Sequence, residues 1–163
     1  MNAIIICIFL FLVQASLGCE DSIDCRYPMF CQGGRCTTRC FEEAKRAKAQ
    51  CGKRVECPIP DCDAFGNYSP VQCLYHMCFC SSRDGKQLTK PFIPHDSSNC
   101  RCAVIKYEFA HNNNPEVKYA CQENGNFKPL QCEGGNCFCV DLNGRVIKDK
   151  KSVPVLDKDT LKC

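Results

Sequence analysis

The sequence predicts a small disulfide-rich α+β protein, made of two similar modules that follow a short cysteine-rich module. Three observations lead to this fold class: 19 of the 163 residues are cysteine, one block of residues recurs 59 positions later, and one segment has the spacing of an amphipathic helix. Each of the two similar modules has roughly 60 residues and so buries too little apolar surface to be stable on its core alone. Stabilising disulfides are therefore expected. We expect each repeat to hold one short helix, a small irregular antiparallel sheet and long loops.

The first 18 residues predict a signal peptide. They carry no charged side chain, are apolar from Ala3 to Val13, and end in small residues that suit cleavage after Gly18. The apolar run is shorter than the roughly 20 residues of a membrane span, and an uncleaved anchor is the alternative. We therefore expect a secreted, extracellular protein with no membrane segment.

The cysteine pattern favours disulfides over a metal site. Removal of the signal peptide takes Cys7 away and leaves an even number of cysteines, 18. A zinc site would need C-x2-C pairs with suitably placed histidines, whereas the close pairs here are C-x-C: Cys78/Cys80, Cys100/Cys102 and Cys137/Cys139. We expect no metal and no cofactor. The net charge of +3 is too small to indicate a nucleic-acid partner.

A repeat of period 59 defines the modules. The block Cys62–Cys73 recurs as Cys121–Cys132, with Cys, Gly, Asn, Pro, Gln and Cys in register and an aromatic residue at the same place. A Cys-Phe-Cys triplet follows each block. These matches predict modules at residues 40–100 and 102–163, joined by Arg101 alone and preceded by the cysteine-rich module at 19–39.

Local patterns predict the elements of each repeat. Thr38 is a suitable N-cap for a helix from Arg39 or Cys40 to Gln50. The counterpart from Cys102 to about Phe109 is a weaker helix because several of its residues favour strands. Asp-Gly and Asn-Gly dipeptides predict tight hairpins after the C-x-C strands. Gly66 and Gly125 stand where a tight turn needs positive φ.

The repeated block, followed by Cys-aromatic-Cys, resembles the thyroglobulin type-1 domain, which occurs in the protease inhibitors called thyropins. In that family six cysteines pair consecutively. The resemblance therefore implies Cys40–Cys62, Cys73–Cys78 and Cys80–Cys100 in the first repeat, and Cys102–Cys121, Cys132–Cys137 and Cys139–Cys163 in the second. Phe79 and Phe138 stand where the family usually has Trp, and we expect them to be packing residues.

Six further cysteines lie outside this framework. Cys51 and Cys57 occur in the first repeat only, and the simplest pairing is with each other; their bridge would either preorganise a binding loop or only stabilise a longer connection. The N-terminal module holds Cys19, Cys25, Cys31 and Cys36, whose pairing the sequence leaves open.

No catalytic motif is present, and we expect a protein that is not an enzyme. His76, His95 and His111 lie in segments that read as loops, without a nucleophile or metal motif beside them. Asn67-Tyr68-Ser69 is a weak glycosylation sequon because Pro70 follows it directly.

The resemblance implies a monomeric inhibitor that blocks the active-site cleft of a papain-like cysteine protease with rigid stapled loops. An aspartic protease is a second possible target, and a binding module for a growth factor or matrix partner is the alternative function. The candidate edges are 52–60 and 74–77 in the first repeat and 111–117 and 133–136 in the second. The candidate inhibitory residues within them are Gly52, Lys53, Arg54, Val55, Glu56, Leu74, Tyr75, His76, Met77, Asn113, Asn114, Pro115, Glu116, Glu133, Gly134, Gly135 and Asn136.

Overall fold

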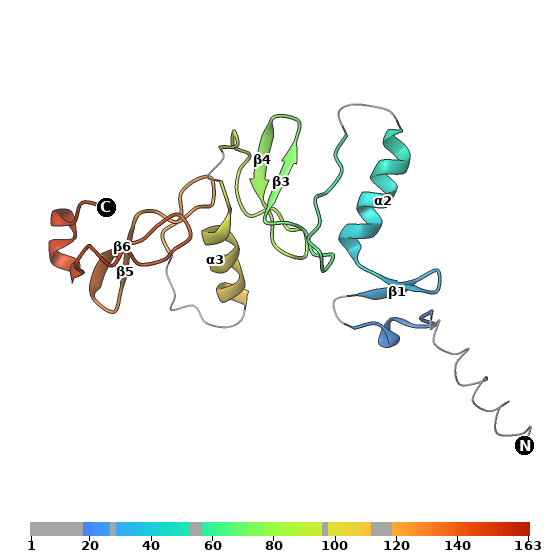
Figure 1. Cartoon of the computed structure of the whole chain (residues 1–163), viewed down its shortest axis with the longest axis horizontal. Helices are drawn as coiled ribbons and strands as arrows, with labels where there is room; N and C mark the ends of the chain where they lie inside the picture. The colour runs from blue at the N-terminus through green and yellow to red at the C-terminus, as the bar shows by residue number, and fades with distance from the viewer. Residues whose placement is uncertain (1–17, 27–28, 53–56, 96–97, 112–118) are drawn as a thin grey trace, which may run out of the picture. The chain divides into compact units, whose positions relative to one another are not determined.

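The computed structural model of the chain describes residues 18–26, 29–52, 57–95, 98–111 and 119–163 (Figure 1). Almost all of the predicted signal peptide, and the candidate edge residues 53–56 and 113–116, lie outside these ranges. The chain divides into two compact units, one up to Arg39 and one from Cys40 to Cys163. Among the described residues, no helix is long and apolar enough to cross a membrane.

The N-terminal unit is a hairpin held by two crossed bridges. It contains the short helix η2 (Ser22–Asp24) and the antiparallel strands β1 (Phe30–Gln32) and β2 (Arg35–Thr37). Two glycines with positive φ, Gly33 and Gly34, form the turn between the strands. The bridges are Cys19–Cys31 and Cys25–Cys36.

The first repeat begins with helix α2 (Arg39–Cys51), directly after Thr38, which confirms the predicted helix. Cys40 is the one buried residue that the helix contributes, and its bridge to Cys62 ties the helix to the repeated block. The Glu43 carboxylate accepts a hydrogen bond from the Tyr68 hydroxyl group, which links a second residue of the helix to the same block. The helix is thus attached to the block at two points.

Each repeat contains the same two-stranded ladder. In the first, β3 (Val71–Leu74) pairs with β4 (Met77–Cys80); in the second, β5 (Leu130–Glu133) pairs with β6 (Asn136–Cys139) in the same register. The second ladder gains a third strand, β7 (Val153–Pro154), which leads into helix η3 (Val155–Thr160). In the first repeat an isolated bridge between Cys78 and Phe92 has the corresponding place.

In each repeat, the glutamine directly before the third framework cysteine makes three side-chain hydrogen bonds to the backbone around the second framework cysteine. We call this set of bonds the glutamine clasp. The Gln131 side chain accepts a hydrogen bond from the Ala120 amide at 3.0 Å and donates to the carbonyls of Ala120 and Lys128 at 2.7 and 2.8 Å. Gln72 makes the matching three bonds with Asp61 and Ser69. Both glutamine side chains are buried away from water, so these hydrogen bonds are what satisfies their amide groups.

The core of each repeat contains cystines and one buried aromatic ring, which is Tyr68 in the first repeat and Phe127 in the second. Phe127 packs with Cys102 and Val140, so the core of the second repeat also has an aliphatic residue. Gly85 and Gly144 pack so closely on these rings that a Cβ atom would lie 2.7 Å from ring carbons. Phe79 and Phe138 are only half-buried, and Phe138 packs against the core of its repeat.

The turns at Asp84-Gly85 and Asn143-Gly144 are wider than the tight hairpins that the sequence predicts. The chain reverses over Ser82–Lys86, and one isolated bridge, Ser81 to Gln87, closes the reversal in place of a ladder. The Ser82 amide donates to the Lys86 carbonyl at 2.9 Å and the Lys86 amide donates to Ser82 Oγ at 2.9 Å, and Gly85 packs on the Tyr68 ring. The tight two-residue hairpins lie earlier, at residues 75–76 and 134–135.

Helix α3 (Arg101–His111) joins the two repeats. Cys100, which bonds Cys80, has φ +58 and turns the chain straight from the first repeat into the helix. The Asn99 amide donates to the Asn126 side chain at 2.9 Å, and Asn126 is fully buried. Within the second repeat, the Gly125 carbonyl accepts the Ala103 amide at 3.1 Å. The bond between Asn99 and Asn126 puts the two repeats in direct contact.

Candidate functional site

The tip of the β3–β4 hairpin presents apolar side chains to solvent. Tyr75 is 63% exposed and Leu74 is 39% exposed, with His76 exposed beside them and Met77 half-buried. Tyr75 has φ +57, which costs a non-glycine residue about 1–2 kcal/mol. This conformation is what permits a two-residue connection between the strands.

Cross-links immediately behind the tip hold it rigid. Cys73 and Cys78 face each other across the ladder with their Cα atoms 4.0 Å apart, and they are bonded. The amide and carbonyl groups of Cys78 bond to Phe92 at 2.8 and 2.7 Å, on the side away from Cys73. Cys73 and Cys78 therefore form a non-hydrogen-bonded pair, whose side chains come closest together. The tip is anchored by a bridge on one side and by a backbone pair on the other.

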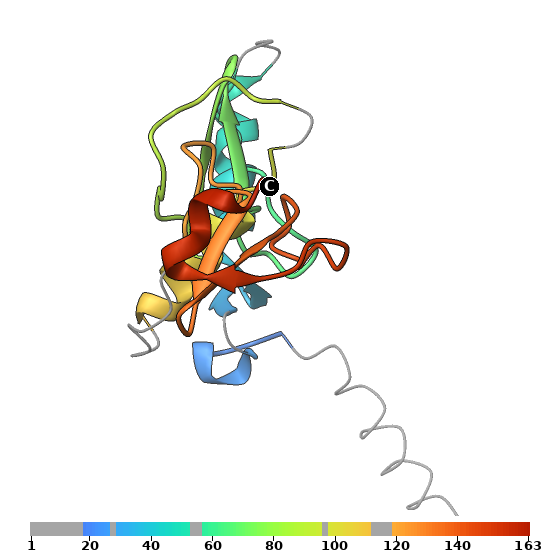
Figure 2. The same ribbon diagram turned by 90° about the vertical axis from the view of Figure 1, so that its left-hand side faces the viewer.

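The end of helix α2 lies at the same end of the first repeat as the hairpin tip, in both Figure 1 and Figure 2. The helix ends at Cys51, which is bonded to Cys57, and Gly52 follows with φ +56. The Gly52 amide still donates to the Lys48 carbonyl. The other candidate residues of this edge, Lys53 to Glu56, lie outside the described residues.

The second hairpin tip has a different character. Glu133, Gly134, Gly135 and Asn136 are exposed, and none of them is apolar. The Gly135 carbonyl accepts the Val155 amide at 2.9 Å, so η3 is attached to this tip, and Leu156 on η3 is 91% exposed. Sequence reasoning missed this apolar neighbour because no motif marks it. The candidate residues 113–116 lie outside the described residues.

The Asn67 side chain is engaged in the fold. It is half-buried, and its Nδ2 donates to Asp63 Oδ2 at 3.0 Å. Partial desolvation raises the pKa of the Asp63 carboxyl, but hydrogen bonds from Asn67 and Phe65, with the nearby Arg83, lower it more, so the pKa lies below its ordinary value. A glycan on Asn67 would take one of the two Nδ2 hydrogens and leave the other for the bond to Asp63.

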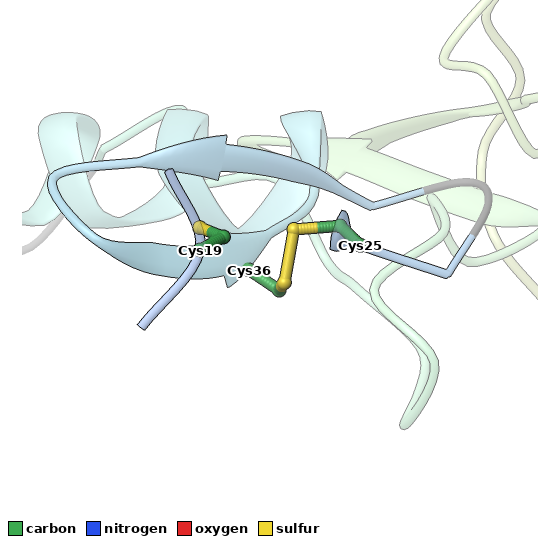
Figure 3. A group of neighbouring side chains, drawn as sticks. All are labelled: Cys19, Cys25 and Cys36. Atoms are coloured by element: carbon green, nitrogen blue, oxygen red, sulfur yellow. A yellow bond between two sulfur atoms is a disulfide. The ribbon is translucent and has the colours of Figure 1, made fainter. Parts of the chain in front are cut away.

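Two further groups of described residues have side chains that could take part in chemistry: the three histidines and a cluster of cysteine sulfur atoms. His76, His95 and His111 are all exposed. The sulfur atoms of Cys19, Cys25 and Cys36 lie within 4.8 Å of one another (Figure 3). Each of these sulfurs is in a disulfide, so none is a thiolate that could bind a metal ion.

The sequence matches a known family over most of its described length. The family model for the Thyroglobulin type-1 repeat matches residues 36–100 and 110–158. The chain belongs to the thyroglobulin type-1 family. Both thyroglobulin type-1 repeats carry the glutamine clasp and the bonded hairpin described above.

Three relatives from other organisms are similar to this chain in sequence. Equistatin of Actinia equina is 35% identical over 101 residues, which is 54% of this chain and 42% of equistatin. U20-hexatoxin-Hi1a of Hadronyche infensa is 30% identical over 126 residues, 71% of this chain and 83% of the toxin. Bovine thyroglobulin (Bos taurus) is 29% identical over 102 residues, 58% of this chain and only 4% of thyroglobulin. The match thus spans a small part of thyroglobulin and under half of equistatin.

Proposed function

We propose that this protein is a secreted, non-catalytic inhibitor of thyropin type, which blocks the active-site cleft of a papain-like cysteine protease. Membership of the thyroglobulin type-1 family and the similarity to equistatin support an inhibitory role. The observation that carries the proposal is the rigid hairpin tip of the first repeat, with Tyr75 exposed at its end. We assign the inhibitory edge to this tip and to the end of α2 beside it.

The physical basis is that a clamped turn fills a cleft without offering a cleavable strand. A protease binds its substrate as an extended chain, and residues 74–77 cannot extend while Cys73 and Cys78 are bonded 4.0 Å apart at Cα. Because the tip has one conformation before binding, little conformational freedom is lost on binding. An exposed aromatic ring on such a tip supplies a large apolar contact area.

The first repeat is the better candidate for this role. Its tip carries Leu74 and Tyr75, whereas the tip of the second repeat consists of polar residues and glycine. The bridge Cys51–Cys57 belongs to the first repeat alone and closes the neighbouring segment. We expect the second repeat to bind the same protease weakly or to have a different target.

The test is a panel of cysteine, aspartic and serine proteases assayed with the disulfide-bonded chain. We expect competitive inhibition of a papain-like enzyme. Burial of a tyrosine side chain is worth about 1.5–3 kcal/mol, so Tyr75→Ala should raise the inhibition constant about 10- to 100-fold. Phe65→Ala is the matched control, because Phe65 is 77% exposed and lies in the turn between Cys62 and Tyr68, outside the β3–β4 hairpin.

Two results would overturn the proposal. If no protease of the panel is inhibited competitively, the role as an inhibitor is wrong, and the remaining function is a binding module for a growth factor or matrix partner. If inhibition occurs but Tyr75→Ala and Phe65→Ala behave alike, the tip of the first repeat is not the inhibitory edge. Inhibition of an aspartic protease alone would correct the protease class and leave the tip to be tested in the same way.

A further inference from the structure

The contact between the two repeats leaves a groove of about 780 Å³, which the inhibitory edge does not use. One wall is the segment 88–92, which follows the Ser82–Lys86 turn of the first repeat. The other walls are one face of helix α3 and the start of the second repeated block. The lining residues are Leu88, Thr89, Lys90, Pro91, Phe92, Ala103, Lys106, Tyr107, Ala110, Cys121, Gln122 and Glu123. The volume lies within the range of roughly 300–1,000 Å³ that is usual for ligand pockets.

Helix α3 has a distinct face for this groove. Ala103, Lys106, Tyr107 and Ala110 follow the spacing i, i+3, i+4, i+7 and so lie on one side of the helix. Cys102 and Ile105 belong to the core of the second repeat instead. The alanines keep the groove open because they fill little space, and the Tyr107 ring gives it an apolar surface. The helix therefore serves the core and the groove with separate sets of residues.

The charge of the groove is positive. Lys90 and Lys106 line it and are exposed, and the Lys86 ammonium group lies 5.1 Å from the centre of the Tyr107 ring. Glu123 supplies the one carboxylate in the lining. Within the described part of the chain, neither Lys90 nor Lys106 makes an ion pair. The groove thus combines an apolar surface with the ammonium groups of Lys90 and Lys106, which have no ion-pair partner among the described residues.

We propose that this groove binds an acidic peptide segment of a partner protein, with an apolar side chain between carboxylates. The apolar side chain would contact Leu88, Phe92 and Tyr107, and the carboxylates would pair with Lys90 and Lys106. The two lysines come from different walls of the groove, on the segment 88–92 and on α3. A peptide with a carboxylate on each side of its apolar residue can pair with both. This binding does not depend on the inhibitory function.

The test uses a fluorescein-labelled Asp-Glu-Phe-Glu-Asp peptide and the whole disulfide-bonded chain, with fluorescence anisotropy at low and high salt. We expect binding that weakens as salt rises, because exposed charges are screened. The double variant Lys90→Glu/Lys106→Glu should lose at least tenfold in affinity. The double variant Lys148→Glu/Lys151→Glu changes the net charge equally at exposed sites outside the groove and should stay within about threefold, since only nonspecific attraction is altered.

A further variant and two further ligands test whether the groove itself is the binding site. Ala110→Trp should abolish binding by filling the groove, and because Ala110 is exposed near the end of α3, the chain should still fold. Equal affinity for the neutral Asn-Gln-Phe-Gln-Asn peptide, or equal loss in both lysine double variants, would overturn the proposal. The proposal would also be overturned if the chain bound a fatty acid anion but not the peptide. The same holds if no peptide binding is seen at about 1 mM, because the binding free energy is then weaker than about 4 kcal/mol.

Discussion

Gly125 offers a direct test of how the two repeats are joined. A Cβ atom at this position would lie 2.3 Å from the Cys80 sulfur and 3.2 Å from both Ala103 Cβ and Cys100 Cα. Gly125→Ala therefore forces the second repeat away from the bridge that ends the first. The glycine also has φ +80, so the substitution adds a backbone cost that must be measured separately.

Gly135→Ala measures that backbone cost. Gly135 has φ +83, almost the same as Gly125, and nothing lies within 4 Å of the position of its Cβ. Both variants should lose about 1–2 kcal/mol from the left-handed conformation. Only Gly125→Ala should lose a further 1–3 kcal/mol, the usual range for overpacking in a tightly packed site. We therefore expect the free energy of unfolding to differ by about 1–3 kcal/mol between the two variants.

The assay is guanidinium unfolding followed by circular dichroism with all disulfides intact. Hydrogen exchange of the Asn99 amide gives a second measurement, because this amide bonds to Asn126, next to the substituted residue. Exchange should become faster in Gly125→Ala and stay unchanged in Gly135→Ala. Equal losses of stability in both variants, with unchanged exchange at Asn99, would refute the inference that Gly125 carries the contact between the repeats.

Three further predictions concern single features of the repeats. Gln131→Leu removes three buried hydrogen bonds and should cost about 2–4 kcal/mol in guanidinium unfolding; unchanged stability would show that the clasp is dispensable. Because the pKa of Asp63 is lowered in the folded protein, its stabilising contribution is complete above the ordinary value of 3.8 and is lost as pH falls through the lower folded value. Acid unfolding of Asp63→Asn should lack this loss, and an identical acid profile for both proteins would contradict it. Replacement of Cys51 and Cys57 by Ser should leave the framework folded but weaken protease inhibition about tenfold or more through faster dissociation, since ordering the freed segment costs roughly 1–2 kcal/mol per residue; unchanged inhibition would make this bridge purely structural.

The regular elements were predictable because their signals are local. A polar cap and apolar residues at helical spacing predicted α2 to within a residue of its observed end at Cys51. The weaker helix after Arg101 also forms and extends to His111, although its residues favour strands. There, bonds made outside the helix, such as that of the Ala103 amide with Gly125, outweigh intrinsic propensity. The existence of both helices was therefore predictable, and so were the bounds of α2, while the length of α3 was not.

The position of the tight hairpins was not predictable from dipeptides alone. Asp84-Gly85 looks like a two-residue turn, yet the chain reverses more widely there, over Ser82–Lys86, with Gly85 packed on the ring of Tyr68. The tight turn falls instead at Tyr75, a residue that seldom has positive φ, because the bonded pair behind it brings the strands together. The groove was also invisible in the sequence, since its walls come from segments that only the contact between repeats brings together.

The short span of the bridges has a consequence for biosynthesis. Among the described residues, every bridge joins cysteines within a single module, and the longest span is 24 residues, from Cys139 to Cys163. In the secreted protein that we propose, a cysteine that enters the oxidising compartment thus meets its partner soon after, before the next module has emerged. Local closure keeps the loop-closure entropy small and limits the time in which non-native pairs can form. A chain with this many thiols can therefore mature from its N-terminal end onward, one module after another.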